Sequence, residues 1–289
     1  MAVARQFRGP IDLHAHSSVS DGTETPAELV HAAAMAGLGT IALTDHDSTV
    51  GWAEASAAAR TEHLTLIPGM EFSTRVRYAS VHLLAYLFDP DDSALLAEMT
   101  RVRAARLSRA EQMVARIGAD YDLSWDDVLA QTTPEATVGR PHIADALVAR
   151  GHALNRSAAF ADILHWKAGY FQPHYAPDPV RAIELVRAAG GVPVIAHPAT
   201  RGIGDVVAES SLKTMVEAGL FGLELEHREN NPEPTKRLYE LAAKFGLSVT
   251  GSSDYHGTGK PNLLGENTTA PDVLDRIIAE GRGAAPVYG

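Results

Sequence analysis

The sequence predicts an α/β fold in which parallel strands close, or nearly close, into a barrel. Two observations predict it: seven short apolar runs recur along the chain, and helical patterns separate several of them. The high apolar content of the runs favours a barrel over an open sheet. The runs are PIDLHAH, GTIALTDHD, LTLIPGMEF, VHLLAYLF, GVPVIAHP, GLFGLELEH and LSVTGSSDYH.

The first run ends in two histidines. Ile11 and Leu13 alternate with Asp12 before a turn rich in glycine and serine, which is typical of a short strand. Alternate side chains of an extended chain share a face, so His14 and His16 are expected to point the same way. Two imidazoles placed in this way predict a metal site.

The helices are marked by their first and last residues. Thr25 is a predicted N-cap, Pro26 occupies the first helical position, and Glu28 completes a capping box. This helix is expected to end at Gly37. Residues 178–190 repeat the pattern, with Asp-Pro at the start and glycine at the end.

The third and fourth runs are predicted to form a hairpin with its centre near Val76 and Arg77. A register symmetric about that centre sets Glu71 opposite His82, with Cβ atoms about 4.5 to 5.5 Å apart. The two side chains would then reach one metal ion, although His82 begins its run.

The segment from about residue 90 to 175 contains no convincing strand and is rich in alanine and arginine. It predicts a helical insertion. We therefore expect a barrel domain formed by residues 1–90 and 176–289, with residues 91–175 as a helical cap.

The composition narrows the classes of function. No apolar stretch reaches the roughly 20 residues needed to cross a bilayer, and the first residues lack the apolar core of a signal peptide, so we expect a cytoplasmic protein. The net charge of -11 argues against a broad basic groove. Neither a membrane nor a stable nucleic-acid complex is expected as a partner. There is no cysteine, so imidazole and carboxylate must bind any metal.

Most of the runs end in histidine, aspartate or glutamate. In a βα barrel the carboxyl ends of the strands share one face, which carries the active site. Carboxylates and imidazoles gathered there need cations to offset their charge. Mixed nitrogen and oxygen ligands suit manganese, iron or zinc. The side chains concerned are His14, His16, Asp45, His46, Glu71, His197, Glu224, His227, Asp254 and His256.

The motifs HAH, SDG, TDHD, PGMEFST, AHP and GSSDYHG, in this order, resemble those of the PHP phosphoesterase family, named for polymerase and histidinol phosphatase domains. The resemblance spans residues 12 to 256. It implies a distorted (β/α)7 barrel, similar to a TIM barrel, with up to three divalent metal ions. Manganese is the first expectation, with iron or zinc as alternatives.

The resemblance also implies which residues bind the ions. The ligands of the first ion would be His14, His16, Glu71 and Asp254. Glu71 would bridge to a second ion bound by His82 and His197, and it would fix the spacing of the two ions. The third ion would be bound by Asp21, His46 and His256. Asp12 and Asp45 would orient the imidazoles.

The insertion and the run GRPHIADALV resemble a branch of small bacterial PHP proteins that act on nucleoside 3',5'-bisphosphates, with a related activity that trims RNA from its 5' end. The expected reaction is hydrolysis of the 3'-phosphate by a metal-activated hydroxide, as from pAp to AMP and phosphate. The expected partner is therefore a small nucleotide or a short RNA. His227 is the candidate acid for the leaving group. The candidates for phosphate binding are Arg140, His142, Lys167 and Arg201.

Three alternatives stay open. A histidinol-phosphate phosphatase of the same family fits the GRPHIA run less well. An amidohydrolase also places HxH on a first barrel strand, but it normally needs a bridging lysine at a strand end. A metal-binding module without activity is the third. The remaining histidines are assigned to the surface or the core: His31, His63, His152, His165 and His174.

Overall fold

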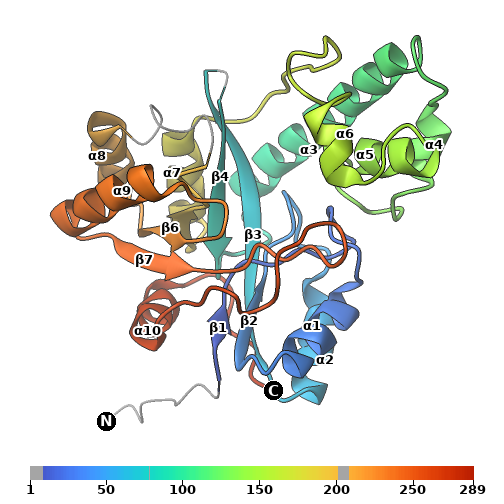
Figure 1. The fold of residues 1–289 in the computed structure, drawn as a ribbon. Coiled ribbons are helices and arrows are strands. Elements are labelled where there is room, and N and C mark those ends of the chain that lie inside the picture. Colours follow the sequence, from blue (N-terminus) through green and yellow to red (C-terminus); the bar gives the residue numbers. More distant parts are fainter. Residues whose placement is uncertain (1–8, 78, 201–207) are drawn as a thin grey trace, which may run out of the picture.

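The protein is described by a computed structural model covering residues 9–77, 79–200 and 208–289 (Figure 1). Seven strands form one sheet whose spatial order equals their order in the chain. This confirms the seven predicted strands. Their bounds are β1 (Ile11–Asp12), β2 (Thr40–Leu43), β3 (Thr65–Val76), β4 (Ala79–Tyr86), β5 (Val192–Ile195), β6 (Gly222–Glu226) and β7 (Ser248–Gly251).

The sheet curls into a nearly closed and irregular barrel, as predicted. Neighbouring strands are parallel from β1 to β3 and from β5 to β7, whereas β4 is antiparallel to both β3 and β5. An isolated bridge between Ala15 and Tyr255 joins the chain after β1 to the chain after β7. Because β4 is reversed, its first residues lie at the face where the parallel strands end. This explains why His82 begins its run.

The predicted register of the β3–β4 hairpin is wrong by two residues. Ser73 pairs with His82, and Glu71 pairs with Leu84. Val76 pairs with Ala79 next to the turn, so the centre of the hairpin lies slightly later in the chain than predicted. A shift of two residues keeps every side chain on its face, so His82 is a diagonal neighbour of Glu71 and still contacts it.

The two predicted helix starts are observed. The Thr25 side chain accepts from the Glu28 backbone N–H, and Glu28 accepts from the Thr25 backbone N–H. Gly37 and Gly190, which follow the first and the seventh helix, have positive φ of 79° and 76°. The helices are α1 (Pro26–Met35), α2 (Trp52–Thr61), α3 (Ser93–Ile117), α4 (Trp125–Leu129), α5 (Arg140–Ala149), α6 (Arg156–Ala161), α7 (Pro179–Ala188), α8 (Glu209–Glu217), α9 (Pro232–Phe245) and α10 (Pro271–Glu280).

Residues 91–175, called here the helical segment, carry α3 to α6, and α4 to α6 lie to one side of the barrel (Figure 1). The first half of α3 packs on the barrel core through Leu95, Met99 and Val102. Its second half joins a separate apolar cluster with α4, α5 and α6, which includes Met113 and Ile143. One long helix therefore connects the two cores. Within the described ranges, none of the helices has the length and apolar character needed to cross a membrane.

Candidate active site

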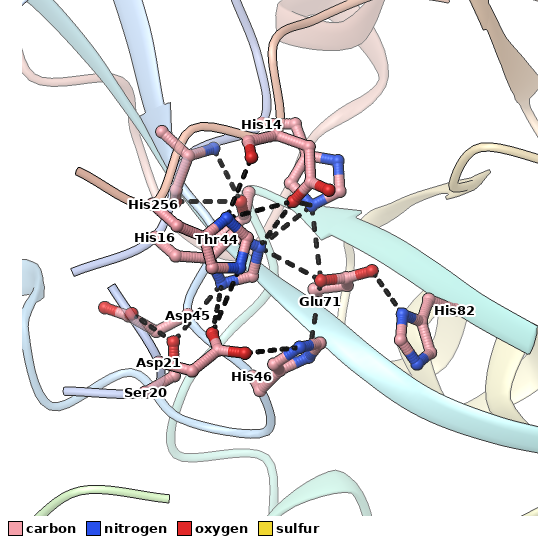
Figure 2. A network of polar contacts seen from close by, with 12 residues as sticks. His14, His16, Ser20, Asp21, Thr44, Asp45, His46, Glu71, His82 and His256 are labelled. Carbon is pink, nitrogen blue, oxygen red and sulfur yellow. Dashed lines mark hydrogen bonds and ion pairs between the residues drawn. The ribbon is translucent and has the colours of Figure 1, made fainter. Parts of the chain in front are cut away.

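Four side chains at the barrel face point at a common centre (Figure 2). The Nε2 atoms of His14 and His16 lie 3.0 Å apart. Glu71 Oε2 lies 3.2 and 3.0 Å from these two nitrogens, and Asp254 Oδ1 lies 3.3 Å from both. Atoms about 2.0 to 2.1 Å from a tetrahedral ion lie about 3.3 Å from one another. The spacing therefore fits a divalent metal ion.

Glu71 faces two groups of imidazoles with its two oxygens. Oε2, besides its contacts to His14 and His16, lies 3.3 Å from His46 Nδ1. Oε1 lies 2.6 Å from His82 Nδ1 and 3.1 Å from His197 Nε2. A carboxylate placed in this way can bridge two ions.

A further group surrounds Asp21. Its Oδ1 lies 3.2 Å from His256 Nε2, and its Oδ2 lies 3.7 Å from His46 Nε2. Among the described residues, Asp21 Oδ1, His256 Nε2 and Asp254 Oδ1 are buried without a hydrogen-bond partner. Buried polar atoms of this kind are costly unless something binds them, so a cation fits here as well.

The carboxylates of the cluster are ionised. Burial by itself would raise the pKa of Glu71, but the imidazoles of His82, His46 and His14 hold that pKa well below its usual range. For Asp254, burial is likewise outweighed by Lys260, whose ammonium lies 2.6 Å from Oδ2, and by His14. Negative ligand oxygens are therefore present at neutral pH.

Glu224 positions this cluster, a role that the sequence did not assign to it. Its Oε1 accepts from His14 Nδ1 at 3.0 Å, which turns His14 Nε2 toward the common centre. Its Oε2 accepts from the His197 backbone N–H at 2.9 Å. Its position on β6 was the available signal, since Glu224 is buried and Glu226 on the same strand is exposed.

The predicted role of Asp12 and Asp45 in orienting imidazoles needs correction. Asp12 accepts from backbone N–H groups, including those of Ser253 at 3.0 Å and Gly265 at 2.9 Å. Asp45 accepts from Ser17 and from the Ser20 hydroxyl, which is itself 3.2 Å from His16 Nδ1. Asp12 therefore ties loops together, and Asp45 reaches an imidazole only through a serine.

Two of the clustered residues have unusual backbones. His197 follows β5 with φ of 29°, and Asp254 follows β7 with φ of 54°. Positive φ is uncommon outside glycine and concentrates at functional sites, because the surrounding structure must hold it in place.

A cavity of about 480 Å³ opens between the cluster and the helical segment. Asp21, His46 and His82 line its barrel side. Five cations also line it. The sequence predicted a site role for Arg140 alone; the other four are Arg106, Arg109, Arg156 and Lys260. The signal for two of them was a buried face on α3, where Arg106 and Arg109 are three residues apart.

The cations differ in their partners. Arg106 donates to the Ser73 hydroxyl at 2.7 Å and lies 3.3 Å from Asp47 Oδ2. Arg109 and Arg140, by contrast, have no ion pair or hydrogen bond with any described residue, and Arg140 packs on two aromatic rings. Burial, with Arg106 close by, lowers the pKa of both. Guanidinium groups that are desolvated and unpaired provide a site for an anion.

The other predicted site residues are placed as follows. His142 Nδ1 accepts from the Gly139 backbone N–H, so His142 caps α5 and lines a neighbouring groove instead of the cavity. Lys167 is exposed, and its ammonium lies 5.0 Å from the centre of the Trp166 ring. Arg201 lies outside the described residues. His227 is buried, with Nε2 3.7 Å from Asp254 Oδ2, and it lines a third groove.

One histidine assigned to the surface or the core lies in the cavity. His174 lies near the end of the helical segment, after α6, and it lines the cavity near Arg109. Its Nδ1 contacts the Tyr175 carbonyl at 2.7 Å. Neither a strand end nor a motif marked this position in the sequence.

The chain is similar over most of its length to several known proteins. The model of the PHP domain family matches residues 12–117. A 3',5'-nucleoside bisphosphate phosphatase of Chromobacterium violaceum is 33% identical, with 93% of this chain and 95% of that protein aligned. A 5'-3' exoribonuclease of Haemophilus influenzae is 31% identical over 92% of this chain and 96% of its own length. A crystal structure from Bifidobacterium adolescentis, for which metal-dependent phosphoesterase activity has been suggested, has 44% identity, covers 95% of this chain and 97% of its own, and superposes with a TM-score of 0.92.

Proposed function

The chain belongs to the PHP domain family of metal-dependent phosphoesterases, and from this premise we propose that it removes the 3'-phosphate of nucleoside 3',5'-bisphosphates. With adenosine 3',5'-bisphosphate the products would be AMP and phosphate. The observation that carries the proposal is that one cavity has a metal-binding cluster at one end and two unpaired arginines at the other.

The charges of such a substrate match both ends of the cavity. One phosphate would lie at the cluster, and the second would lie against Arg109 and Arg140. Bidentate contacts from guanidinium groups orient a phosphate as well as bind it. A monophosphate at the cluster would leave both arginines without an anion, which is the physical reason to expect a preference for bisphosphates.

In this mechanism the residues of the chain have three tasks. Divalent ions bound by the His14, Asp21 and Glu71 groups would activate water and offset charge on the phosphate that is cleaved. Glu71 would hold neighbouring ions at a fixed spacing. Lys260, whose pKa is raised by Asp254 and Glu229 against the opposing effect of burial, would offset negative charge next to the cluster. His227 has a raised pKa, but it faces a different groove, and we do not assign it to the leaving group.

Trimming of short RNA from its 5' end is the second candidate. It is supported by relatives described as 5'-3' exoribonucleases, such as that of Haemophilus influenzae. A 5'-phosphorylated RNA presents the same arrangement of 5'-phosphate and 3'-linked phosphorus. The same residues would act on both substrates.

For the organisation of the chain, we propose a barrel formed by residues 1–90 and 176–289 with residues 91–175 as a cap. The separate apolar cluster of α4 to α6 supports this division, and so do the arginines that reach from α3 and α5 to the cavity.

The test is phosphate release by manganese-loaded enzyme from adenosine 3',5'-bisphosphate, compared with AMP, histidinol phosphate and a 5'-phosphorylated oligoribonucleotide, with products identified by mass. We expect AMP from the bisphosphate and little turnover of the two monophosphates. Preference for histidinol phosphate, or no turnover of any substrate by metal-loaded protein, would contradict the proposal.

A further inference from the structure

A second groove, of about 640 Å³, lies beside the catalytic cavity and has a different character. Hydroxyl and amide side chains from barrel loops and from the helical segment line much of it, beside apolar residues such as Val148 and Leu154 and the charged pair Asp145 and Arg156. Neutral groups of this kind suit the sugar and base edges of a nucleotide. The lining includes Ser18, Thr23, Gln131, Thr133, Asn155 and Thr258.

The cavity and the groove meet along one seam. Asp21 lines the cavity and the next residue, Gly22, lines the groove. Likewise, Pro141 lines the cavity and His142 lines the groove. Arg156 and Gly259 line both spaces. The two spaces are therefore neighbours separated at this seam by side chains.

Arg156 fills the seam. Its Nε and Nη2 donate to the two Asp145 carboxylate oxygens at 2.8 and 2.5 Å, and its Nη1 donates to the Asp21 carbonyl at 2.9 Å. The guanidinium thus connects α5 of the helical segment to the barrel loop after β1. Its side chain is 12% exposed. Gly259 leaves room for it, because a Cβ there would lie 2.3 Å from Arg156 Nη1.

We propose that the Arg156–Asp145 pair is a partition that ends the catalytic cavity after one nucleotide, and that the groove beyond it accepts the second nucleotide of a short RNA when the pair opens. This inference rests on the proposed function. Arg156 differs from Arg109 and Arg140 because its charge is already matched by Asp145. It therefore limits the length of the substrate instead of binding the terminal phosphate.

Removing Asp145 tests the partition, because the Asp145 carboxylate contacts Arg156 and is not itself one of the residues of the metal cluster. Asp145→Ala frees Arg156 from α5 and widens the seam. The ratio of kcat/KM for a 5'-phosphorylated diadenylate to that for adenosine 3',5'-bisphosphate should rise about tenfold or more, because a charge-assisted pair no longer closes the path. Turnover of the bisphosphate should change by less than about threefold. Glu111→Ala, an exposed acid on α3, is the matched control and should leave the ratio unchanged.

A binding measurement separates failure of the partition from failure of the proposed function. A fluorescent, non-hydrolysable analogue of 5'-phosphorylated diadenylate is titrated into metal-loaded wild-type protein and into metal-loaded Asp145→Ala, so the measurement does not depend on turnover. Tighter binding to the variant supports the partition even if the bisphosphate proves not to be the substrate. Equal affinity in the two proteins overturns it. Gly259→Ala, whose Cβ displaces the guanidinium, gives the same comparison should Asp145→Ala fail to fold.

Discussion

The two ends of the catalytic cavity are built in opposite ways. At the barrel end, neighbouring imidazoles and carboxylates lie 2.6 to 3.7 Å from one another, and they come from β3, β4 and β6 or from loops that follow other strands. At the cap end, Arg109 on α3 and Arg140 on α5 form no ion pair with any carboxylate of the described residues, whereas their neighbour Arg106 lies 3.3 Å from Asp47 Oδ2. The first group has the ligand atoms that divalent cations bind, and the second has the guanidinium groups that an anion binds.

This difference shows how one cavity can recognise two features of a ligand. The barrel end has negative ligand atoms whose charge a metal ion would offset, and the cap end has positive groups whose charge a phosphate would offset. A dianionic phosphate at each end, with ions at the cluster, would satisfy both. We therefore expect variants at the barrel end to abolish all turnover and variants at the cap end to change which ester is preferred.

The largest effect is expected at the barrel end, from Asp254→Asn. The amide keeps the shape but removes the negative charge from the four-atom centre. We expect kcat/KM to fall about a thousandfold or more for every phosphate ester, which corresponds to roughly 4 kcal/mol. Addition of Mn²⁺ should raise the melting temperature of the wild-type protein more than that of the variant. Asp275→Asn, an exposed acid on α10, is the control. Full activity of Asp254→Asn would refute the assignment of the cluster.

The next effect is expected at the cap end, from Arg109→Ala and Arg140→Ala. Loss of one charge-assisted contact to phosphate should lower kcat/KM for the bisphosphate about 10- to 100-fold. A small aryl phosphate has no second phosphate, so its turnover should change by less than about threefold. Steady-state kinetics with both substrates, and the exposed Arg60→Ala as control, make the comparison. Equal losses on the two substrates would remove the proposed phosphate contact.

The sequence predicted the barrel end far better than the cap end, for a physical reason. Parallel strands bring their carboxyl ends together, so residues such as His14 and Asp254 could be placed from the strand pattern alone. The contact between His82 and Glu71 was predicted correctly from a wrong register, because a shift of two residues leaves each side chain on the same face of the sheet. No such rule places Arg109, whose position depends on how α3 crosses the barrel. His174 depends on the path of a connecting chain, and its location was missed for the same reason.

A smaller effect at the barrel end is expected from Glu224→Gln. The amide can still approach His14 Nδ1, but it no longer offers two negative oxygens to that ring and to the His197 N–H. Partners of this kind typically change metal affinity about 10- to 100-fold. Competition with a chromophoric chelator measures this affinity without any turnover. Glu226→Gln, on the same strand but exposed, should bind metal like the wild type. If Glu224→Gln does so too, Glu224 is not a positioning residue.

The smallest effect is expected from His174, whose pKa depends in part on the arginines at the cap end. Burial, followed by the nearby Arg109 and Arg106, lowers the pKa of His174 to about 3. In the unfolded chain this imidazole takes up a proton below about pH 6.5. The neutral ring therefore contributes stability that is fully present above that pH and is lost as the pH falls from about 6.5 toward 3, by at most about 1.4 kcal/mol per pH unit.

Urea unfolding at pH 7 and pH 5.5 measures this contribution. His174→Gln cannot take up the proton, so it should lose about 1 kcal/mol less stability than the wild type between the two pH values. Arg109→Ala should raise the pKa of His174, because one of the charges that oppose protonation is gone. An identical pH dependence in His174→Gln and wild type would mean that His174 takes up its proton equally well in the folded and the unfolded protein. Arg109 and Arg106 would then not lower its pKa, which would contradict a concentration of positive charge at the cap end.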